Sequence, residues 1–265
     1  MANVDELFAV KGQVVLVSGG SRGIGQAIAK GFADRGAQVV ITGREEKPLQ
    51  KTAEEMSTAE VQVCPLLCDV AKSQDIKRVV DQTLEKFGHI DTLINVAGVN
   101  RRKKAENFSE DDYDFIMNIN LKGAWLLSQA VGRHMIQRGT GNQINIASLN
   151  TFRPLVGVGV YALSKAGMGA MTQSLATEWG PHGVRVNAIA PGFILTDLTN
   201  KLWSLPHMQA WNNQNCPMKR LGKPEDMVGA SIFLASPAAS FLTGQILYVD
   251  GGVTAGSCWP IDLDA

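Results

Sequence analysis

Residues 13–36 read QVVLVSGGSRGIGQAIAKGFADRG, and this stretch decides the fold class. A short apolar, β-branched run is followed by a glycine turn and then by apolar residues at helical spacing. Gly19, Gly23 and Gly25 allow a tight turn, and they let backbone N–H groups approach a pyrophosphate beside the positive end of the helix. The stretch therefore predicts a strand, a turn and a helix that together bind a dinucleotide.

The same alternation of strand and helix continues to the end of the chain. Strands are expected at 13–19, 37–43, 61–70, 90–98, 142–148, 184–192 and 246–252. Helices are expected at 25–36, 45–56, 75–87, 109–138 with a break near 118–120, 161–180 and 224–235. Such alternation produces a mostly parallel sheet with helices on both faces. We predict an α/β fold, with residues 1–265 forming a single doubly wound Rossmann-type domain around a mostly parallel seven-stranded sheet.

The least regular segment is 193–217, which reads FILTDLTNKLWSLPHMQAWNNQNCP. A long insert after a late strand often covers the ligand site in such folds, so we predict a substrate lid here. An oligomer contact or a packed loop is the alternative interpretation.

Composition excludes several classes of partner. The 265 residues contain 25 Lys and Arg against 25 Asp and Glu, so nothing indicates a nucleic-acid or membrane surface. Cys64, Cys68, Cys216 and Cys258 form no Cys-x-x-Cys pair, and neither a disulfide framework nor a metal site is predicted. The start, MANVDELFAVKG, has acids where a signal peptide needs positive charge, so a cytoplasmic location is expected.

Two arginines bear on the choice of cofactor. Arg22 lies in the glycine turn, where a cation is unfavourable unless an anion compensates it. The second strand ends at Gly43 and Arg44, whereas NAD sites commonly have an acid at that strand end. We predict a preference for NADP(H), with NAD(H) as the alternative because Glu45 and Glu46 follow directly. The alternative interpretation is that Arg22 and Arg44 are solvated surface residues without a ligand.

Seven further motifs follow the glycine turn in order. They are CDV at 68–70, NVAG at 95–98, MNIN at 117–120, NIAS at 145–148, YALSK at 161–165, APG at 190–192 and YVDGG at 248–252. With SGGSRGIG at 18–25, they resemble the short-chain dehydrogenase/reductase family over nearly the whole chain. Two departures are Val96, where the family more often has Asn, and Ser18, where Thr is usual.

Tyr161 and Lys165 are four residues apart, so they share one face of a helix. Alone, such a pair usually forms a solvated helix surface. The resemblance implies instead that Tyr161 exchanges a proton with the substrate oxygen and that Ser148 orients this oxygen. It also implies that Asn120 holds a water that links Lys165 to solvent. An ammonium about 4 Å away would lower the phenol pKa by about three units.

The resemblance also implies a set of cofactor contacts. Residues after the third and fourth strands would hold adenine and ribose, and residues after the sixth strand would hold the nicotinamide amide and the phosphates. The full set is Gly19, Ser21, Arg22, Gly23, Ile24, Gly25, Arg44, Asp69, Val70, Asn95, Ala97, Gly98, Tyr161, Lys165, Pro191, Gly192, Ile194 and Thr196.

The substrate is expected to be a small molecule. Arg101 and Arg102 follow the fourth strand, at the edge where parallel sheets bind ligands, and Asn150 and Arg153 follow Ser148. We predict that these four residues bind substrate together with Ser148 and Tyr161, because a guanidinium pairs well with a carboxylate. NRRK at 100–103 also resembles gluconate 5-dehydrogenases and 2-deoxygluconate 3-dehydrogenases, which implies a sugar acid or polyol. A solvated charge run is the alternative.

Three other functions stay open at this point. A 3-oxoacyl-carrier-protein reductase would use the basic run for its acidic carrier, and a tropinone-reductase-like ketone reductase would need an apolar lid. A non-enzymatic NADP sensor would be expected to lack one of the four catalytic residues. The resemblance further implies a homotetramer, with a dimer as the second choice.

Overall fold

Seven parallel strands form one sheet in the computed structural model, which describes residues 6–259. The ends of the predicted domain, 1–5 and 260–265, lie outside the described residues. The strands are β1 (Val14–Ser18), β2 (Gln38–Gly43), β3 (Val63–Leu67), β4 (Thr92–Asn95), β5 (Gly141–Ile146), β6 (Val184–Pro191) and β7 (Ile246–Val249). Their order across the sheet is β3-β2-β1-β4-β5-β6-β7, and every neighbouring pair is parallel. The predicted seven-stranded, doubly wound fold is confirmed.

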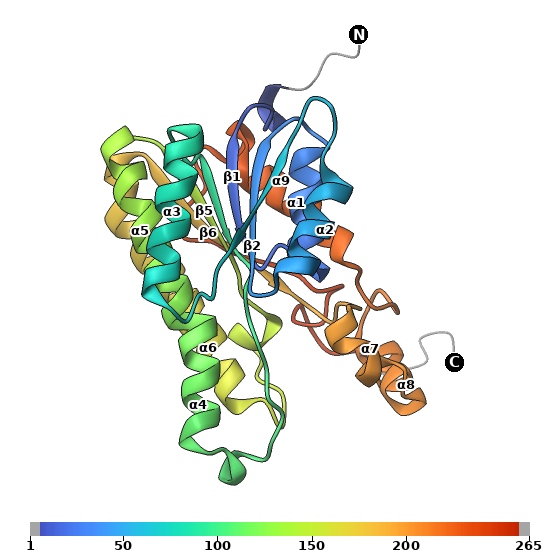
Figure 1. Cartoon of the computed structure of the whole chain (residues 1–265). Helices are drawn as coiled ribbons and strands as arrows, with labels where there is room; N and C mark the ends of the chain where they lie inside the picture. Colours follow the sequence, from blue (N-terminus) through green and yellow to red (C-terminus); the bar gives the residue numbers. More distant parts are fainter. Residues whose placement is uncertain (1–5, 260–265) are drawn as a thin grey trace.

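Helices cover both faces of this sheet (Figure 1). They are α1 (Gly23–Ala33), α2 (Glu46–Met56), α3 (Ser73–Phe87), α4 (Glu110–Met117), α5 (Ala124–Arg138), α6 (Gly159–Trp179), α7 (Asp197–Trp203), α8 (Pro206–Asn215) and α9 (Val228–Ala235). One apolar core packs α1, α2 and α9 against the sheet, and a second packs α3, α5 and α6 against the other face. Phe32 of α1 and Met135 of α5 are fully buried examples from the two cores.

The predicted break within 109–138 is present and has a definite form. A capping box, in which Ser109 and Asp112 exchange hydrogen bonds with each other's backbone, starts α4. A π-helical turn, Asn118–Gly123, separates α4 from α5. Such turns are rare and are frequent at functional sites, and this one contains Asn120.

The segment predicted to be the least regular contains two helices, α7 and α8. The aromatic ring of Phe193 lies 5.1 Å from that of Trp203 and 5.4 Å from that of Trp211, both measured between centroids and both edge-on. Short helices are marginal alone, so this packing, together with Pro206 in the first turn of α8, is what makes them form. Figure 1 shows α7 and α8 at the same end of the sheet as α4.

The strand order reverses between β1 and β4, which defines the edge where ligands bind in such sheets. The glycine turn follows β1 and the basic run follows β4, so both stand at this reversal. Within residues 6–259, no helix has both the length and the apolar character needed to cross a bilayer. Over the same range, no three His, Cys, Asp or Glu side chains are grouped so that they could hold a metal ion.

Candidate active site

The turn between β1 and α1 is closely packed and requires glycine. Gly19 has φ +72°, and a Cβ there would lie 2.9 Å from the backbone of Ala97. A Cβ on Gly25 would lie 2.2 Å from the carbonyl oxygen of Gly19. The N-terminus of α1 at Gly23 follows Arg22, which caps the helix without a side-chain hydrogen bond. Free backbone N–H groups, the helix dipole and a guanidinium therefore meet at one place, which suits a pyrophosphate.

A cleft of about 480 Å³ lies beside this turn. Of the residues predicted to bind the cofactor, it is lined by Gly19, Ser21, Arg22, Gly23, Ile24, Gly25, Arg44, Asp69, Val70, Ala97, Gly98 and Thr196. Pro48, Phe115, Ile119 and Leu198 also line it, and the sequence analysis did not name them. Ile119 lies within the MNIN motif at 117–120 and Phe115 lies two residues before it, so this motif was the sequence signal for both. A glycine cradle of this size fits a dinucleotide.

Four predicted cofactor residues have other surroundings. Asn95 is buried, and its amide donates to Ser128 Oγ and to Asn145 Oδ1, both at 2.9 Å. Pro191, which ends β6, and Ile194 are also buried. A Cβ on Gly192 would lie 2.6 Å from Asp250 Cα, so this glycine allows a close backbone approach. In the chain alone none of these four residues lines the cleft, and Ile194 lines a second, smaller cavity instead.

Lys165 lies on α6 with only 3% of its surface exposed. Its ammonium donates to the carbonyl oxygen of Ile146 at 2.6 Å and lies 5.8 Å from the centroid of the Tyr161 ring. Burial lowers the pKa of Lys165 from 10.5 to about 8. The amine therefore stays mostly charged at neutral pH and is held next to the phenol.

The side chains of Tyr161 and Ser148 lie close enough for Ser148 to influence the pKa of the phenol. The pKa of Tyr161 is raised, mainly because burial disfavours the phenolate, while Ser148 and the charge of Arg102 act in the lowering direction. The expected decrease of about three units caused by Lys165 is therefore wrong for the chain alone. The phenol is desolvated, and the ammonium faces the carbonyl of Ile146.

Asn120 is fully buried in the π-helical turn. Its Oδ1 accepts from the backbone N–H of Val99 at 2.7 Å, and its Nδ2 donates to the Val99 carbonyl at 2.9 Å and to Ser164 Oγ at 3.0 Å. The Asn120 side chain thus ties the segment after β4 to α6. The sequence analysis did not name Val99 or Ser164, although Ser164 belongs to the YALSK motif.

The basic run after β4 divides into paired and unpaired charges. Arg101 donates to Asp112 at 2.7 Å and lies over the ring of Phe115 at 4.1 Å, and Lys103 also binds Asp112. Asp112 is 2% exposed, and these two hydrogen bonds hold its pKa well below the usual range. Arg102 is exposed, makes no hydrogen bond or ion pair within residues 6–259, and acts electrostatically on Tyr161. The capping-box spacing from Ser109 to Asp112 was the sequence signal for the buried carboxylate.

The two candidates beyond Ser148 also have partners within the chain. Arg153 is exposed and donates to the carbonyl of Val253 at 3.0 Å. Asn150 donates to Ser148 Oγ from its side chain at 3.2 Å and accepts from the backbone N–H of Leu155 at 3.0 Å. The structure therefore places Asn150 beside the Ser148 hydroxyl and Arg153 against the segment that follows β7.

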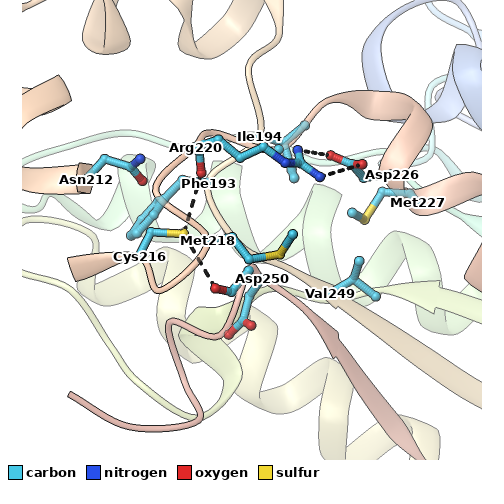
Figure 2. Close-up of a pocket in the computed structure, with 12 residues that line it drawn as sticks. Phe193, Ile194, Asn212, Cys216, Met218, Arg220, Asp226, Met227, Val249 and Asp250 are labelled. Atoms are coloured by element: carbon cyan, nitrogen blue, oxygen red, sulfur yellow. Dashed lines mark hydrogen bonds and ion pairs between the residues drawn. The ribbon is translucent and has the colours of Figure 1, made fainter. Parts of the chain in front are cut away.

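A second, smaller cavity of about 140 Å³ lies beside α8 (Figure 2). Its lining is made of separate residues between Phe193 and Gly251, including Asn212 of α8. Arg220 and Asp226 form a two-point ion pair at its edge, at 2.7 and 3.0 Å. Asn212 Oδ1 is buried in this wall without a partner among the described residues. None of the four residues expected to be catalytic, Asn120, Ser148, Tyr161 and Lys165, lines this cavity.

Comparison with known proteins agrees with this geometry. Residues 12–254 match the protein family described as enoyl-(acyl carrier protein) reductase. Gluconate 5-dehydrogenase of Gluconobacter oxydans is 38% identical over 94% of this chain and 97% of its own, and NAD-dependent glycerol dehydrogenase of Listeria innocua is 38% identical over the same shares. The crystal structure of a gluconate 5-dehydrogenase from Burkholderia cenocepacia in complex with NADP and tartrate superposes with a TM-score of 0.91 at 34% identity, over 95% of this chain and 98% of that one.

Proposed function

The chain belongs to the short-chain dehydrogenase/reductase family, and we propose that it interconverts the alcohol and ketone of a sugar acid or polyol, using Tyr161 as the general acid and base and NADP(H) as the cofactor. That it is an oxidoreductase acting on alcohols or ketones with a nicotinamide dinucleotide follows from its relatives. The observation that carries the mechanism is the grouping of Ser148, Tyr161 and Lys165 at the carboxyl ends of the central strands.

Each catalytic side chain has a distinct task. When bound, the nicotinamide supplies or accepts a hydride. Tyr161, whose raised pKa keeps it protonated at neutral pH, gives its proton to the carbonyl oxygen as that oxygen gains negative charge. In the oxidative direction, the phenolate takes the alcohol proton. Ser148 donates a hydrogen bond to the same oxygen, and the charged Lys165 stabilises negative charge on the phenol.

The cofactor preference rests on two arginines. Arg22 and Arg44 line the cleft, and neither has an ion pair or hydrogen bond from its guanidinium within residues 6–259. Gly43, at the end of β2, offers no carboxylate to a ribose 2′-hydroxyl. A 2′-phosphate would compensate both cations, which favours NADP(H). The NAD-dependent relative keeps NAD(H) as the second choice, and direct titration with NADPH and NADH decides between them.

The substrate class rests on Arg102. Arg102 is an exposed cation without an ion pair on the segment after β4, as Lys104 is, but it is Arg102 whose charge lowers the pKa of the Tyr161 phenol. A substrate carboxylate would pair with it, and α7, which contributes Leu198 to the cleft, would close over both as a lid. A panel of sugar acids, polyols, neutral ketones and acyl thioesters tests this. Activity on acyl thioesters alone would favour the carrier-protein reductase, and activity on neutral ketones alone would favour the ketone reductase.

We also propose a homotetramer, with a dimer as the second choice. Tyr113 of α4, Trp125 of α5 and Leu163 of α6 are exposed, as are Phe152 and Tyr248 near β7. Helices α4, α5 and α6 also frame a shallow, mostly apolar groove that includes Gly167 and Ala170. Exposed apolar patches of this kind mark subunit contacts. Light scattering at micromolar concentration tests the proposal, and a 28.5 kDa monomer would contradict it.

A further inference from the structure

The hydroxyl of Ser148 receives two hydrogen bonds from a single residue, Asn150. The backbone N–H of Asn150 donates to Ser148 Oγ at 3.1 Å, and the side-chain Nδ2 donates to the same oxygen at 3.2 Å. Both residues are 7% exposed, so solvent competes little for these bonds. The catalytic hydroxyl is therefore held by two N–H groups.

The orientation of the Asn150 amide is fixed from its other end. Its Oδ1 accepts from the backbone N–H of Leu155 at 3.0 Å. Rotating the amide by 180° would place its NH₂ group against that N–H, and two donors would face each other. The backbone of Leu155 thus determines that Asn150 presents a donor, and not an acceptor, to Ser148.

A serine hydroxyl has one proton to donate and two positions at which it accepts. N–H groups fill both accepting positions of Ser148, so its proton is free to point only away from Asn150. The phenol of Tyr161 is a side-chain neighbour of Ser148, so the free proton is available to it. A hydrogen bond that Ser148 donates to the phenol lowers the pKa of Tyr161, because a donor stabilises the phenolate.

We propose that Asn150 is a positioning residue that keeps Ser148 as a hydrogen-bond donor to the substrate oxygen. The inference rests on the proposed alcohol–ketone interconversion. As negative charge develops on the oxygen, Ser148 and Tyr161 both direct donors at it, and no hydroxyl has to reorient during the reaction. Asn150 acts through Ser148, and its amide is engaged by Ser148 and Leu155, so its role differs from direct substrate binding.

The decisive variant is Asn150→Asp. An aspartate keeps an oxygen for the Leu155 N–H and keeps the backbone bond to Ser148, but it presents an acceptor where Nδ2 was a donor. The Ser148 proton then turns toward the carboxylate. We expect kcat for a neutral polyol to fall about 100-fold, with the KM for polyol and the Kd for cofactor changed less than threefold. Asn150→Ala only frees the hydroxyl to rotate, and we expect a loss of about fivefold.

A double-mutant cycle that combines Asn150→Asp with Ser148→Ala separates a positioning role of Asn150 from other roles. If Asn150 acts through Ser148, the Asn150→Asp change costs little further activity in a Ser148→Ala background. A second readout is the pKa of the Tyr161 phenol, measured by absorbance without cofactor in a background where Tyr113 and Tyr248 are phenylalanine. Asn150→Asp should raise that pKa, and most of the rise should vanish in Ser148→Ala. Asn107→Asp adds the same charge at an exposed position and controls for net charge.

Full additivity of the two substitutions, or an effect of Asn150→Asp confined to KM, would overturn the inference. A loss of kcat in Asn150→Ala that equals or exceeds the loss in Asn150→Asp would also overturn it. That result is expected if Asn150 only supports folding through its contact with Leu155. Failure of the proposed function gives a different result, in which the unaltered chain reduces no ketone and oxidises no alcohol in the panel. The phenol titration still tests the Ser148 orientation in that case.

Discussion

The two sides of the candidate site are built differently. On the proposed catalytic side, Ser148 and Lys165 are buried, and each is held by hydrogen bonds from within the chain. On the proposed substrate side, Arg101 and Lys103 share the carboxylate of Asp112, and Arg102 between them has no partner within residues 6–259. Chemistry benefits from groups that are already oriented, whereas recognition of a charged ligand requires a charge that is still free. Asp112 thus pairs with both neighbours of Arg102 and leaves Arg102 itself unpaired.

Replacing Tyr161 should have the largest effect on turnover, because it removes the phenol hydroxyl. Tyr161→Phe keeps the ring and its packing but has no proton to exchange. We expect kcat to fall roughly 10³-fold, while the Kd of the cofactor stays within a factor of about three. Steady-state kinetics and fluorescence titration measure the two quantities. Tyr248→Phe is the matched control, and near-normal turnover of Tyr161→Phe would refute the mechanism.

Replacing Arg44 tests whether an unpaired arginine also determines the preference for NADPH over NADH. Its guanidinium has no partner within residues 6–259 and lines the cleft, so Arg44→Ala should remove a charge-assisted bond to a 2′-phosphate. We expect the Kd for NADPH to rise about 10- to 30-fold and the Kd for NADH to change little. Calorimetry with both cofactors gives the comparison. Tighter binding of NADH than of NADPH by the unaltered chain would contradict the NADP(H) preference.

The difference between neighbouring arginines can be measured directly. Arg102→Ala should raise the KM for a sugar acid about tenfold and leave that for a neutral polyol nearly unchanged, because only the carboxylate loses a partner. Arg101→Ala should instead weaken turnover of both substrates and lower the melting temperature, since it leaves Asp112 without one of its two cations. If the two variants changed the KM values and the melting temperature equally, the pairing with Asp112 would not distinguish the role of Arg101 from that of Arg102.

The smallest effect concerns stability and the burial of Lys165. Its pKa is about 8 in the folded chain against 10.5 in an exposed lysine. Between these values the unfolded chain binds the additional proton, so stability should rise with pH, while below pH 8 the folded chain carries the full cost of the buried charge. We expect unfolding to become about 1 kcal/mol less favourable from pH 8 to 9. Urea denaturation without cofactor measures this, and the rise should be absent in Lys165→Met.

Much of the fold was readable from local sequence. The β-branched runs and helical spacing gave all seven strands and most helices, and the glycine turn after β1 required positive φ at Gly19. These features depend on residues within one strand, turn or helix, which is why sequence reasoning found them. The helices α7 and α8 were missed because they depend on Phe193 packing against Trp203 and Trp211.

The sequence by itself determined the parallel sheet and the position of the glycine turn, and it supplied the residues that we propose for the chemistry. Only the tertiary structure decided which charges are free: Arg101 meets Asp112 eleven residues away, Arg153 meets Val253 one hundred residues away, and Arg102 meets neither. It also decided that burial raises the pKa of Tyr161, where spacing along a helix had suggested the opposite. The reason is physical: periodicity and glycine conformation are local, whereas desolvation and charge pairing depend on neighbours that folding brings from elsewhere in the chain.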